Sequence, residues 1–412
     1  MCCVACSDEQ GGTVLDAGVP DGSVPPDAAP DADGGQDADA GPATRPNVVL
    51  FVVDDMGWTD WQADAQLNPT GSIVYETPNM LRLAGQGVTF SQTYAAAPVC
   101  SPTRAALLTG KTPARLRLTE YIPGQGNETA NLREPATWLR NLPAAEVTLA
   151  EALAADGYAT GFFGKWHLGE EGTAAADPLQ NGFEVNVGGL HRGNPTFAGG
   201  YFAGADGAWA EMPGLDTPST YASDAYLSDA LSEQAESFIE QSQQGGRPFF
   251  VMMSHYVVHT PLEAPAELIT KYTQKIAELQ SQGQDLKGHD DPTYAAMVEK
   301  MDQSLGRLLD RLDDPNGDGE ADDSIRNHTI IVFVSDNGGL FPAATGNSPL
   351  REGKGSLYEG GIREPFIVSF TGHAALEQGS RSAARSSSHD VYPTLLAMTQ
   401  VAGDDAQNAS CC

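Results

Sequence analysis

Residues 47–53 read Asn-Val-Val-Leu-Phe-Val-Val and lead directly into Asp54 and Asp55. An unbroken run of apolar, β-favouring residues of this length predicts a strand that is buried on both faces. Strands of this kind occur in sheets that are covered by helices on both sides. The run therefore predicts an α/β fold with a mixed, largely parallel central sheet between layers of helices.

Two more segments share this apolar pattern, and helical patterns lie between the strands. The strand-like segments are residues 248–253 and 329–335, and the helix-like segments are residues 103–109, 149–156, 226–240 and 294–312. In open α/β sheets, binding sites gather at the carboxyl ends of the strands. We therefore expect a site at the residues that follow the two longest strands.

Oxygen-bearing side chains follow both of these strands. Asp54 and Asp55 follow the first, and Asp336 and Asn337 follow the second. Three carboxylates and one amide oxygen form a hard ligand set, which suits Ca²⁺ or Mg²⁺ better than a soft metal. Taken alone, either pair could equally be a helix cap or part of a turn.

The segment Cys100-Ser101-Pro102-Thr103-Arg104 predicts a loop that runs into a helix, with Pro102 near the first helical position. Free backbone N–H groups and the helix dipole make such a helix start favourable for anions, and Arg104 adds a cation. Cys100 is therefore a candidate nucleophile. The alternative is a buried free cysteine that acts as a small apolar residue.

Further candidates lie in three other segments. Lys165 and His167 belong to Gly-Lys-Trp-His-Leu-Gly, and they project the same way if this segment is extended. His259 lies in Val-Val-His-Thr-Pro-Leu, and Lys354 lies in a glycine-rich segment that begins Gly-Lys-Gly-Ser. For a lone lysine, a solvated surface position is the alternative. We interpret His255, four residues before His259, as structural.

Together these motifs resemble the sulfatase family. Cys-x-Pro-x-Arg at residues 100–104, followed by Ala-Ala-Leu-Leu-Thr-Gly, matches the family's maturation signature, in which a dedicated enzyme oxidises the cysteine to formylglycine. The remaining motifs occur in the expected order, and the resemblance runs from about Arg45 to Gly403. It implies an alkaline-phosphatase-like fold and the hydrolysis of sulfate esters.

The resemblance also implies a role for each motif residue. Catalysis falls to Cys100, Arg104, His167 and His259, substrate binding to Lys165, His259 and Lys354, and metal binding to Asp54, Asp55, Cys100, Asp336 and Asn337. The implied metal is Ca²⁺, with Mg²⁺ as the alternative. The hydrate of formylglycine attacks sulfur, His259 with Lys354 protonates the departing alcohol, and His167 acts as a base. The implied partners are a sulfated carbohydrate or other sulfate ester and a formylglycine-generating maturation enzyme.

The composition limits the possible partners. The chain has 412 residues and a formal net charge of −32. This charge argues against nucleic-acid binding, which requires a basic face. A few cations in a cleft can still bind a small anion. Because no apolar run is long enough to span a membrane, the membrane contact that we expect is a lipid anchor.

The two ends of the chain differ from the body. Residues 1–46 are rich in Asp, Pro, Ala and Gly, which predicts a disordered tether. Cys3-Val4-Ala5-Cys6 resembles the end of a bacterial lipoprotein signal, so we expect export to the periplasm, the cell surface or the medium. The catalytic domain is expected at residues 47–403 and an atypical tail at 404–412. Relatives usually continue into a small antiparallel C-terminal subdomain, which we expect to be truncated here.

Several alternatives stay open. Phosphonate and phosphate ester hydrolases of the same superfamily could use the same nucleophile and metal, and an inactive carbohydrate-binding relative would keep the fold without the reaction. The acidic insertion at residues 314–323 resembles a calcium-binding loop, but Ile325 replaces its closing Glu, which favours a solvated turn. Residues 117–124 and 188–193 resemble segments of bacterial enzymes that act on sulfated galactose or galactosamine.

Overall fold

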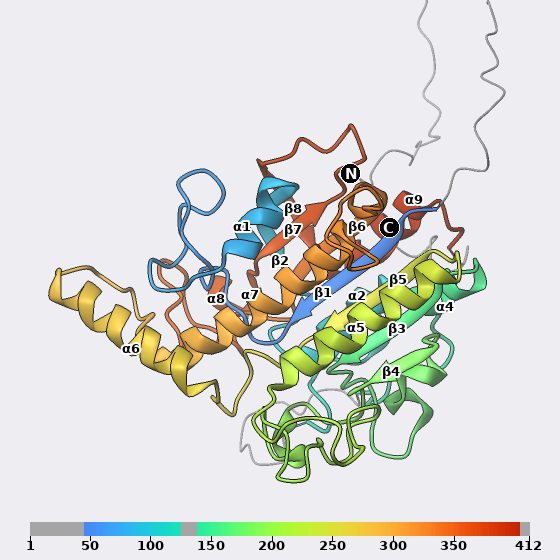
Figure 1. Ribbon diagram of the computed structural model, residues 1–412, viewed down its shortest axis with the longest axis horizontal. Coiled ribbons are helices and arrows are strands. Elements are labelled where there is room, and N and C mark those ends of the chain that lie inside the picture. The colour runs from blue at the N-terminus through green and yellow to red at the C-terminus, as the bar shows by residue number, and fades with distance from the viewer. Residues whose placement is uncertain (1–44, 125–137, 404–412) are drawn as a thin grey trace, which may run out of the picture. The chain divides into compact units, whose positions relative to one another are not determined.

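The computed structural model describes residues 45–124 and 138–403. Within them, eight strands form one sheet, which Figure 1 shows together with the helices that cover it. The strands are β1 (Asn47–Val53), β2 (Val88–Tyr94), β3 (Ala159–Gly164), β4 (Val185–Val187), β5 (Phe249–Ser254), β6 (Thr329–Ser335), β7 (Phe366–Ser369) and β8 (Ser380–Ser387).

The strand order across the sheet is β4-β3-β5-β1-β6-β7-β2-β8. β1 lies at the centre and pairs in parallel with β5 on one side and β6 on the other. β7 is antiparallel to both of its neighbours, and every other pairing is parallel. The predicted mixed, largely parallel sheet is therefore confirmed.

Helices connect the strands and cover the sheet. They are α1 (Pro78–Gly85), α2 (Cys100–Thr109), α3 (Pro113–Leu116), α4 (Leu149–Ala155), α5 (Leu227–Gln244), α6 (Ala266–Ser281), α7 (Pro292–Asp313), α8 (Glu359–Ile362) and α9 (Val391–Thr399). Short 3-10 helices add η1 (Ala174–Ala176), η2 (Pro178–Gln180), η3 (Pro195–Ala198), η4 (Arg326–His328) and η5 (Ser388–Asp390). The four predicted helices are present, but α2 begins at Cys100, three residues before its predicted start.

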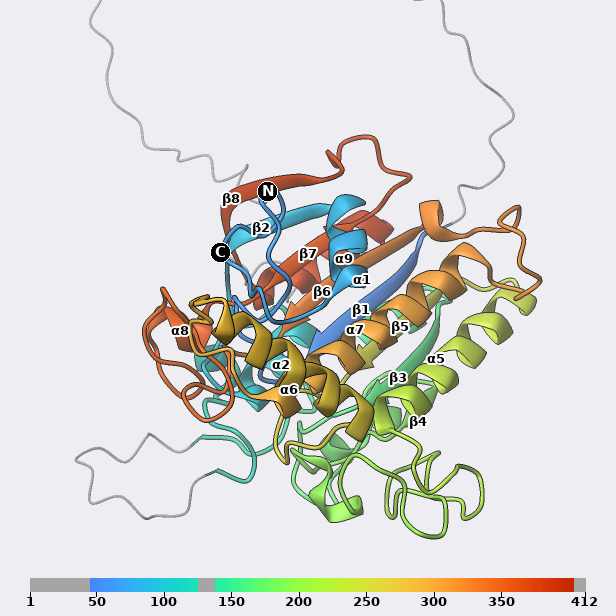
Figure 2. The ribbon, with the colours of Figure 1, turned by 60° about the vertical axis from the view of Figure 1, so that its left-hand side comes forward.

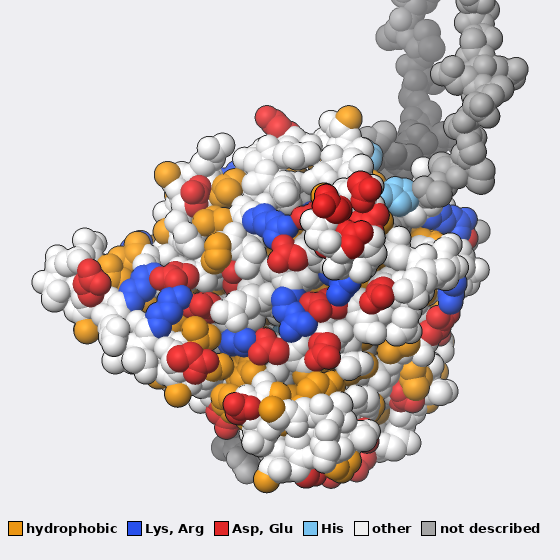
Figure 3. Space-filling model, in the orientation of Figure 1, with side chains coloured by type: hydrophobic (Ala, Val, Ile, Leu, Met, Phe, Trp, Pro, Cys, Tyr) orange, Lys and Arg blue, Asp and Glu red, His pale blue; other side chains and the backbone are white. Residues whose placement is uncertain are grey.

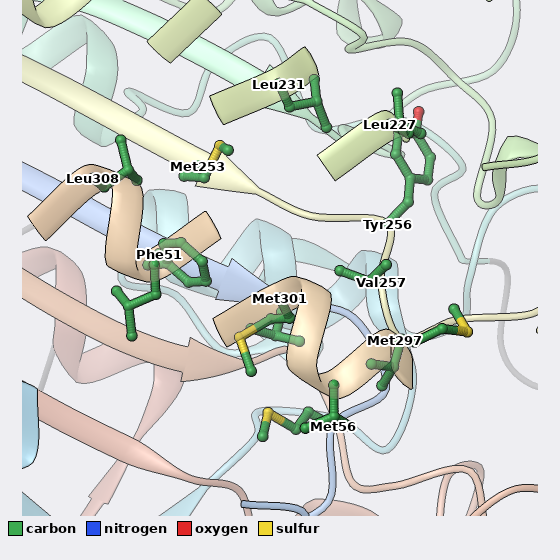
Figure 4. Packing of buried hydrophobic residues seen from close by; sticks show 14 of the residues in the cluster. Phe51, Met56, Leu227, Leu231, Met253, Tyr256, Val257, Met297, Met301 and Leu308 are labelled. Carbon is green, nitrogen blue, oxygen red and sulfur yellow. The ribbon is translucent and has the colours of Figure 1, made fainter. Parts of the chain in front are cut away.

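Side chains of β1 alternate between two apolar cores. Phe51 faces the core that includes Leu231 of α5 and Met301 and Leu308 of α7, and Figure 4 shows these side chains between the strands and the two helices. Leu50 faces the opposite core, with residues of α2, α4 and α9. Figure 2 shows α5 and α7 running along one face of the sheet. Because both faces are covered, the unbroken apolar sequence of β1 is explained.

The outer surface of the helical layer is polar. Figure 3 shows basic and acidic side chains intermingled over the face that α5, α6 and α7 cover. Ion pairs on this face include Lys300–Asp229, Arg307–Glu236 and Lys271–Glu299. Exposed pairs contribute roughly 0–1 kcal/mol each, so the apolar inner faces of these helices provide most of the stability of the layer.

The two described residues that precede β1 contact the folded body. Arg45 forms an ion pair with Asp156, and the Tyr158 hydroxyl donates to the Pro46 carbonyl at 2.8 Å. The remainder of the expected tether, including Cys6, and the tail at residues 404–412 lie outside the described residues. Among the residues that are described, no helix combines the length and apolarity that crossing a membrane requires.

Candidate active site

The carboxylates that follow β1 and β6 meet at one edge of the sheet. Val53 and Ser335 are paired at the ends of the two strands, so the residues after them emerge side by side. The Asp55 backbone N–H donates to Asp336 Oδ1 at 3.2 Å, and the Asn337 side-chain amide donates to Asp55 Oδ1 at 2.8 Å. Asp54, Asp55, Asp336 and Asn337 are all fully buried. The predicted convergence of these four side chains is therefore observed.

Three basic side chains pair with the carboxylates. Lys165 Nζ lies 2.6 Å from Asp54 Oδ2, and Lys354 Nζ lies 2.6 Å from Asp55 Oδ1. Arg104 Nε lies 2.8 Å from Asp336 Oδ2. Charges this deeply buried need partners, because removal from water costs several kcal/mol per ion. The three pairs form a compact buried ionic cluster.

The two adjacent aspartates respond differently to this cluster. Burial, together with Asp336 and Asp55, raises the pKa of Asp54 well above its usual range and outweighs Lys165 and Arg104. Burial also acts to raise the pKa of Asp55, but Lys354, His259 and Lys165 outweigh it and hold that pKa below its usual range. At Asp54, the positive charge of Lys165 and Arg104 is thus insufficient to offset burial and the neighbouring carboxylates.

The cluster fits a hard divalent cation. Asp54 Oδ1 and Asn337 Oδ1 are buried oxygens without a hydrogen-bond partner. Asp54, Cys100 and Asp336 can each offer a ligand atom, and these atoms lie within 4.8 Å of one another. Asp54, Asp55 and His259 form a second such group. Carboxylate and amide oxygens suit Ca²⁺ or Mg²⁺, and a cation would satisfy the two unpartnered oxygens and the excess charge of the aspartates.

Cys100 is the first residue of α2, and its side chain is free and buried. The Thr103 hydroxyl accepts from Ala97 N at 3.1 Å and lies 3.0 Å from Ala97 O, so the loop before Cys100 is tied to the first turn. Burial raises the pKa of the Cys100 thiol, although Lys165 and Lys354 act in the opposite direction. A raised pKa leaves little thiolate at neutral pH, so an unmodified Cys100 is a poor nucleophile.

The two candidate histidines differ in their hydrogen bonds. His167 Nε2 contacts the Ile122 carbonyl, and because a carbonyl only accepts, this nitrogen carries the proton. Nδ1 of His167 is then a buried acceptor without a partner. His259 Nδ1 donates to the Thr260 carbonyl at 2.8 Å, and its Nε2 lies 3.7 Å from Asp55 Oδ2.

The surroundings favour the neutral form of both imidazoles. Burial, then Lys165, lowers the pKa of His167 well below its usual value. Burial also lowers the pKa of His259 to about 4, against the opposing effect of Asp55. A neutral imidazole with a free Nδ1 can accept a proton, so His167 has the state that a general base needs.

An open cavity of about 970 Å³ leads to this cluster. Four predicted residues line it, namely Cys100, His167, His259 and Lys354. Its other polar lining residues include Tyr121, Glu170, Glu171, His191, Arg192 and Asn194. Ligand pockets usually measure about 300–1,000 Å³, so this cavity holds considerably more than a sulfate group.

Lys165 and Arg104 are part of the buried cluster and are not among the residues that line the cavity. The guanidinium of Arg104 also donates to the Lys165 carbonyl at 2.8 Å and to Ser254 Oγ at 2.5 Å. We expected Lys165 and His167 to project the same way if their segment is extended. The φ of His167 is 61°, so the segment is not extended at this residue. Lys165 nevertheless reaches Asp54, and His167 reaches the cavity.

Two residues that support the site residues, Ser254 and Tyr201, were not predicted from the sequence. Ser254, the last residue of β5, accepts from Arg104. The buried Tyr201 hydroxyl lies 2.6 Å from the Tyr256 carbonyl and 2.8 Å from the His259 carbonyl, and so supports the loop that carries His259. The sequence could have indicated Ser254, because it lies at the end of a strand. It could not have indicated Tyr201, which lies in an irregular segment without a hydrophobic pattern.

The two remaining candidates, His255 and the acidic insertion at residues 314–323, have structural roles. His255 is buried, with Nε2 2.8 Å from Ser304 Oγ and its ring 5.1 Å from that of Phe51, in agreement with the structural interpretation. In the acidic insertion, the Asp314 carboxylate accepts from the backbone N–H groups of Gly317 and Gly319 at 2.7 and 2.8 Å. These bonds within the insertion are those of a turn, and the clusters in the described residues that could hold a metal all lie at the sheet edge.

A family model described as Sulfatase matches residues 46–401, which is most of the chain. The protein belongs to the sulfatase family. A curated sulfatase of Formosa agariphila is 33% identical over 396 residues, covering 85% of this chain and 68% of that protein. The N-acetylgalactosamine-6-sulfatase of Sus scrofa is 31% identical over 369 residues, covering 86% of this chain and 62% of that protein. This sulfatase therefore spans between about three-fifths and two-thirds of the length of these relatives.

Solved structures agree with this assignment. The crystal structure of Ps i-CgsB in complex with k-i-k-neocarrahexaose has a TM-score of 0.68 and 29% identity, and the match covers 89% of this chain and 74% of that one. A phosphonate monoester hydrolase of Agrobacterium radiobacter has a TM-score of 0.55 at 19% identity, which shows a shared fold alone. The sulfatase thus has the expected alkaline-phosphatase-like architecture.

Proposed function

We propose that this protein hydrolyses sulfate esters of a carbohydrate, and that residue 100 supplies the nucleophile after conversion of Cys100 to formylglycine. The observation that carries the proposal is the cavity in which Cys100, His167, His259 and Lys354 converge on the buried ionic cluster. Because burial suppresses the Cys100 thiolate, conversion of the side chain gives this position a use that the unmodified thiol lacks.

A hard divalent cation, Ca²⁺ in preference to Mg²⁺, would be held by Asp54, Asp55, Asp336 and Asn337 with residue 100, and would supply electrostatic stabilisation of the transferring group. Lys354 faces the cavity and provides positive charge for sulfate oxygens. Lys165 has the same role from within the cluster, where it now pairs with Asp54. Arg104 holds Asp336 in place through its 2.8 Å contact.

The histidines transfer the protons. His167 accepts a proton from residue 100 through its unpartnered Nδ1. His259 gives a proton to the departing alcohol oxygen, assisted by Lys354. Its pKa of about 4 is that of the free site. A bound sulfate brings negative charge into the cavity, which favours the protonated imidazole.

The names of the relatives support a sulfated sugar as substrate. One relative is an N-acetylgalactosamine-6-sulfatase, and one similar structure holds k-i-k-neocarrahexaose. The size of the cavity agrees with a substrate larger than a sulfate ester of a simple alcohol. We therefore propose a sulfated saccharide built on galactose or galactosamine.

The test is turnover of paired substrates by protein that is co-expressed with a formylglycine-generating enzyme. 4-Nitrophenyl sulfate, 4-nitrophenyl phosphate and 4-nitrophenyl phenylphosphonate share the 4-nitrophenol leaving group and differ in the transferred group. We expect the sulfate ester to be hydrolysed fastest, and the Cys100→Ala variant to be inactive on all three. Faster turnover of the phosphonate or the phosphate would identify a different hydrolase, and no turnover by matured protein would favour a binding protein.

Export through a lipidated Cys6 is a separate proposal, supported by the segment Cys3-Val4-Ala5-Cys6 and the tether that follows it. Fractionation of cells that express the native gene tests it. We expect the protein in the membrane fraction with a lipid on Cys6. A protein found only in the cytoplasm with an unmodified Cys6 would contradict this localisation.

A further inference from the structure

We propose that Arg192 binds a second sulfate group of the substrate, so that the protein prefers saccharides that carry at least two sulfates. The inference rests on the proposed function, because it assumes that the ester to be cleaved lies at residue 100. It concerns the wall of the cavity that Cys100 and Arg192 share.

The segment that carries Arg192 is fixed directly against the catalytic histidine. The His167 backbone N–H donates to the Leu190 carbonyl at 3.1 Å. Gly193 packs so closely on the His167 ring that an added Cβ would lie 2.6 Å from Cε1. Arg192 lies between these two contact points in the sequence. Its position relative to the reacting group is therefore set by the backbone, although the side chain itself is exposed.

The charges around the cavity leave Arg192 without an acidic partner. Glu170 lies 3.4 Å from Arg140, and Glu171 lies 3.8 Å from His191. Lys354 is paired with Asp55 at 2.6 Å. In the described part of the chain, no carboxylate pairs with Arg192, which makes it the arginine of the cavity whose charge is available to a ligand.

The guanidinium of Arg192 also has an aromatic neighbour. Its central carbon lies 5.8 Å from the centroid of the Phe197 ring, within the range of a cation–π contact. An arginine that stacks on an aromatic ring keeps its N–H donors available to other partners. Those donors match the paired oxygens of a sulfate group. A saccharide with one sulfate at residue 100 and another at Arg192 would use both cationic parts of the cavity.

The simpler alternative is an exposed arginine that only interacts with water. A competition assay distinguishes the two. Matured wild-type protein hydrolyses 4-nitrophenyl sulfate in the presence of a monosulfated or a disulfated disaccharide with the same backbone, and the two inhibition constants are compared. We expect the disulfated competitor to bind about three- to tenfold more tightly, as for one exposed charge-assisted contact. Arg192→Gln should remove this preference, and Arg192→Lys should retain part of it.

Arg381→Gln is the matched control, because it removes one exposed positive charge from β8 at the opposite end of the strands. This variant should keep the wild-type preference and should turn over 4-nitrophenyl sulfate at nearly the wild-type rate. An equal ratio of inhibition constants in wild type and Arg192→Gln would overturn the inference. If wild type fails to hydrolyse 4-nitrophenyl sulfate, the proposed function fails, and calorimetric binding of the two disaccharides still decides the role of Arg192.

Discussion

At the scale of single residues, the surroundings of each site residue determine which chemistry it can perform. Cys100 sits at the start of a helix near two lysines, yet burial still raises the pKa of its thiol. His167 is neutral and has an open Nδ1. Asp54 has an open oxygen and too little positive charge around it. These three observations favour a modified residue 100, a general base and a bound cation, respectively.

The first prediction concerns the metal. Asp336→Ala and Asp55→Ala should each lose about one divalent ion per chain, because each removes a carboxylate ligand from the cluster. Elemental analysis of purified, folded protein measures the ion content. Asp318→Ala is the control, since Asp318 lies in the exposed acidic insertion and bonds only within that loop. Unchanged metal content in both cluster variants would refute the site, whereas loss in Asp318→Ala would show that the insertion binds an ion.

The sequence predicts the residues of the buried ionic cluster better than it predicts the residues that hold the site residues in place. Asp54 and Asp336 were identifiable because each follows an apolar strand, and parallel neighbouring strands bring their carboxyl ends together. Tyr201 and the Ile122 carbonyl act through contacts between segments far apart in the chain. No local pattern predicts such contacts, because they depend on how irregular loops pack.

At the scale of secondary-structure elements, the contact of residues 190–193 with His167 gives the second prediction. Gly193→Ala places a Cβ 2.6 Å from His167 Cε1, so the imidazole must move. Misplacement of a catalytic group by about 1 Å can cost up to roughly a hundredfold in rate, and we expect kcat to fall by about ten- to a hundredfold. Gly85→Ala, where an added Cβ meets nothing within 4 Å, is the control. Equal kcat values in the two variants would show that this contact does not position His167.

The third prediction concerns the junction of α1 with α7. Asp302 of α7 accepts from Met80 N at 2.8 Å and Asn79 N at 3.1 Å in the first turn of α1. Burial raises the pKa of Asp302 to about 6, against the lowering effect of these bonds. In the unfolded chain the pKa is about 3.9. Between these values the folded protein binds a proton that the unfolded chain does not, so the stability contributed by this group falls as pH rises from about 4 to 6.

Asp302→Asn removes this titration. The free energy of unfolding is measured by urea denaturation at pH 4.5 and pH 7. The change from pH 4.5 to pH 7 should be more positive in the variant than in wild type by about 2 kcal/mol, because the variant lacks the contribution that falls over this range. Other titrating groups are common to both proteins and cancel in the comparison. Parallel pH dependence in the two proteins would show that Asp302 does not titrate in this range.

At the scale of the whole molecule, the predicted layers of sheet and helices are confirmed. The failure to predict some of the strands has a physical reason. β1 and β6 have their predicted bounds because both are buried on both faces and read as unbroken apolar runs. β8 reads Ser-Arg-Ser-Ala-Ala-Arg-Ser-Ser and is largely exposed at the edge of the sheet. An edge strand without a buried face has no hydrophobic pattern, so its pairing with β2 could not be predicted from the sequence.

The fourth prediction follows from the net charge of −32. Like charges repel in the compact state, and salt screens this repulsion. Raising NaCl from about 0.02 to about 0.5 M, where the Debye length shrinks from roughly 20 Å to a few ångströms, should increase Tm at pH 7.5. The increase should disappear near pH 4.3, the isoelectric point. A Tm that falls with salt at pH 7.5 would mean that attractive ion pairs outweigh the net repulsion.

The central claim is that a modified residue 100 makes this sheet edge a sulfatase active site. Mass analysis of the tryptic peptide that contains residue 100 gives the fraction converted from cysteine to formylglycine, and hydrolysis of 4-nitrophenyl sulfate gives the activity of the same preparation. Across preparations with and without a co-expressed maturation enzyme, activity should rise in proportion to the converted fraction and vanish when only cysteine is present. Undiminished activity in preparations that contain only Cys100 would contradict the claim.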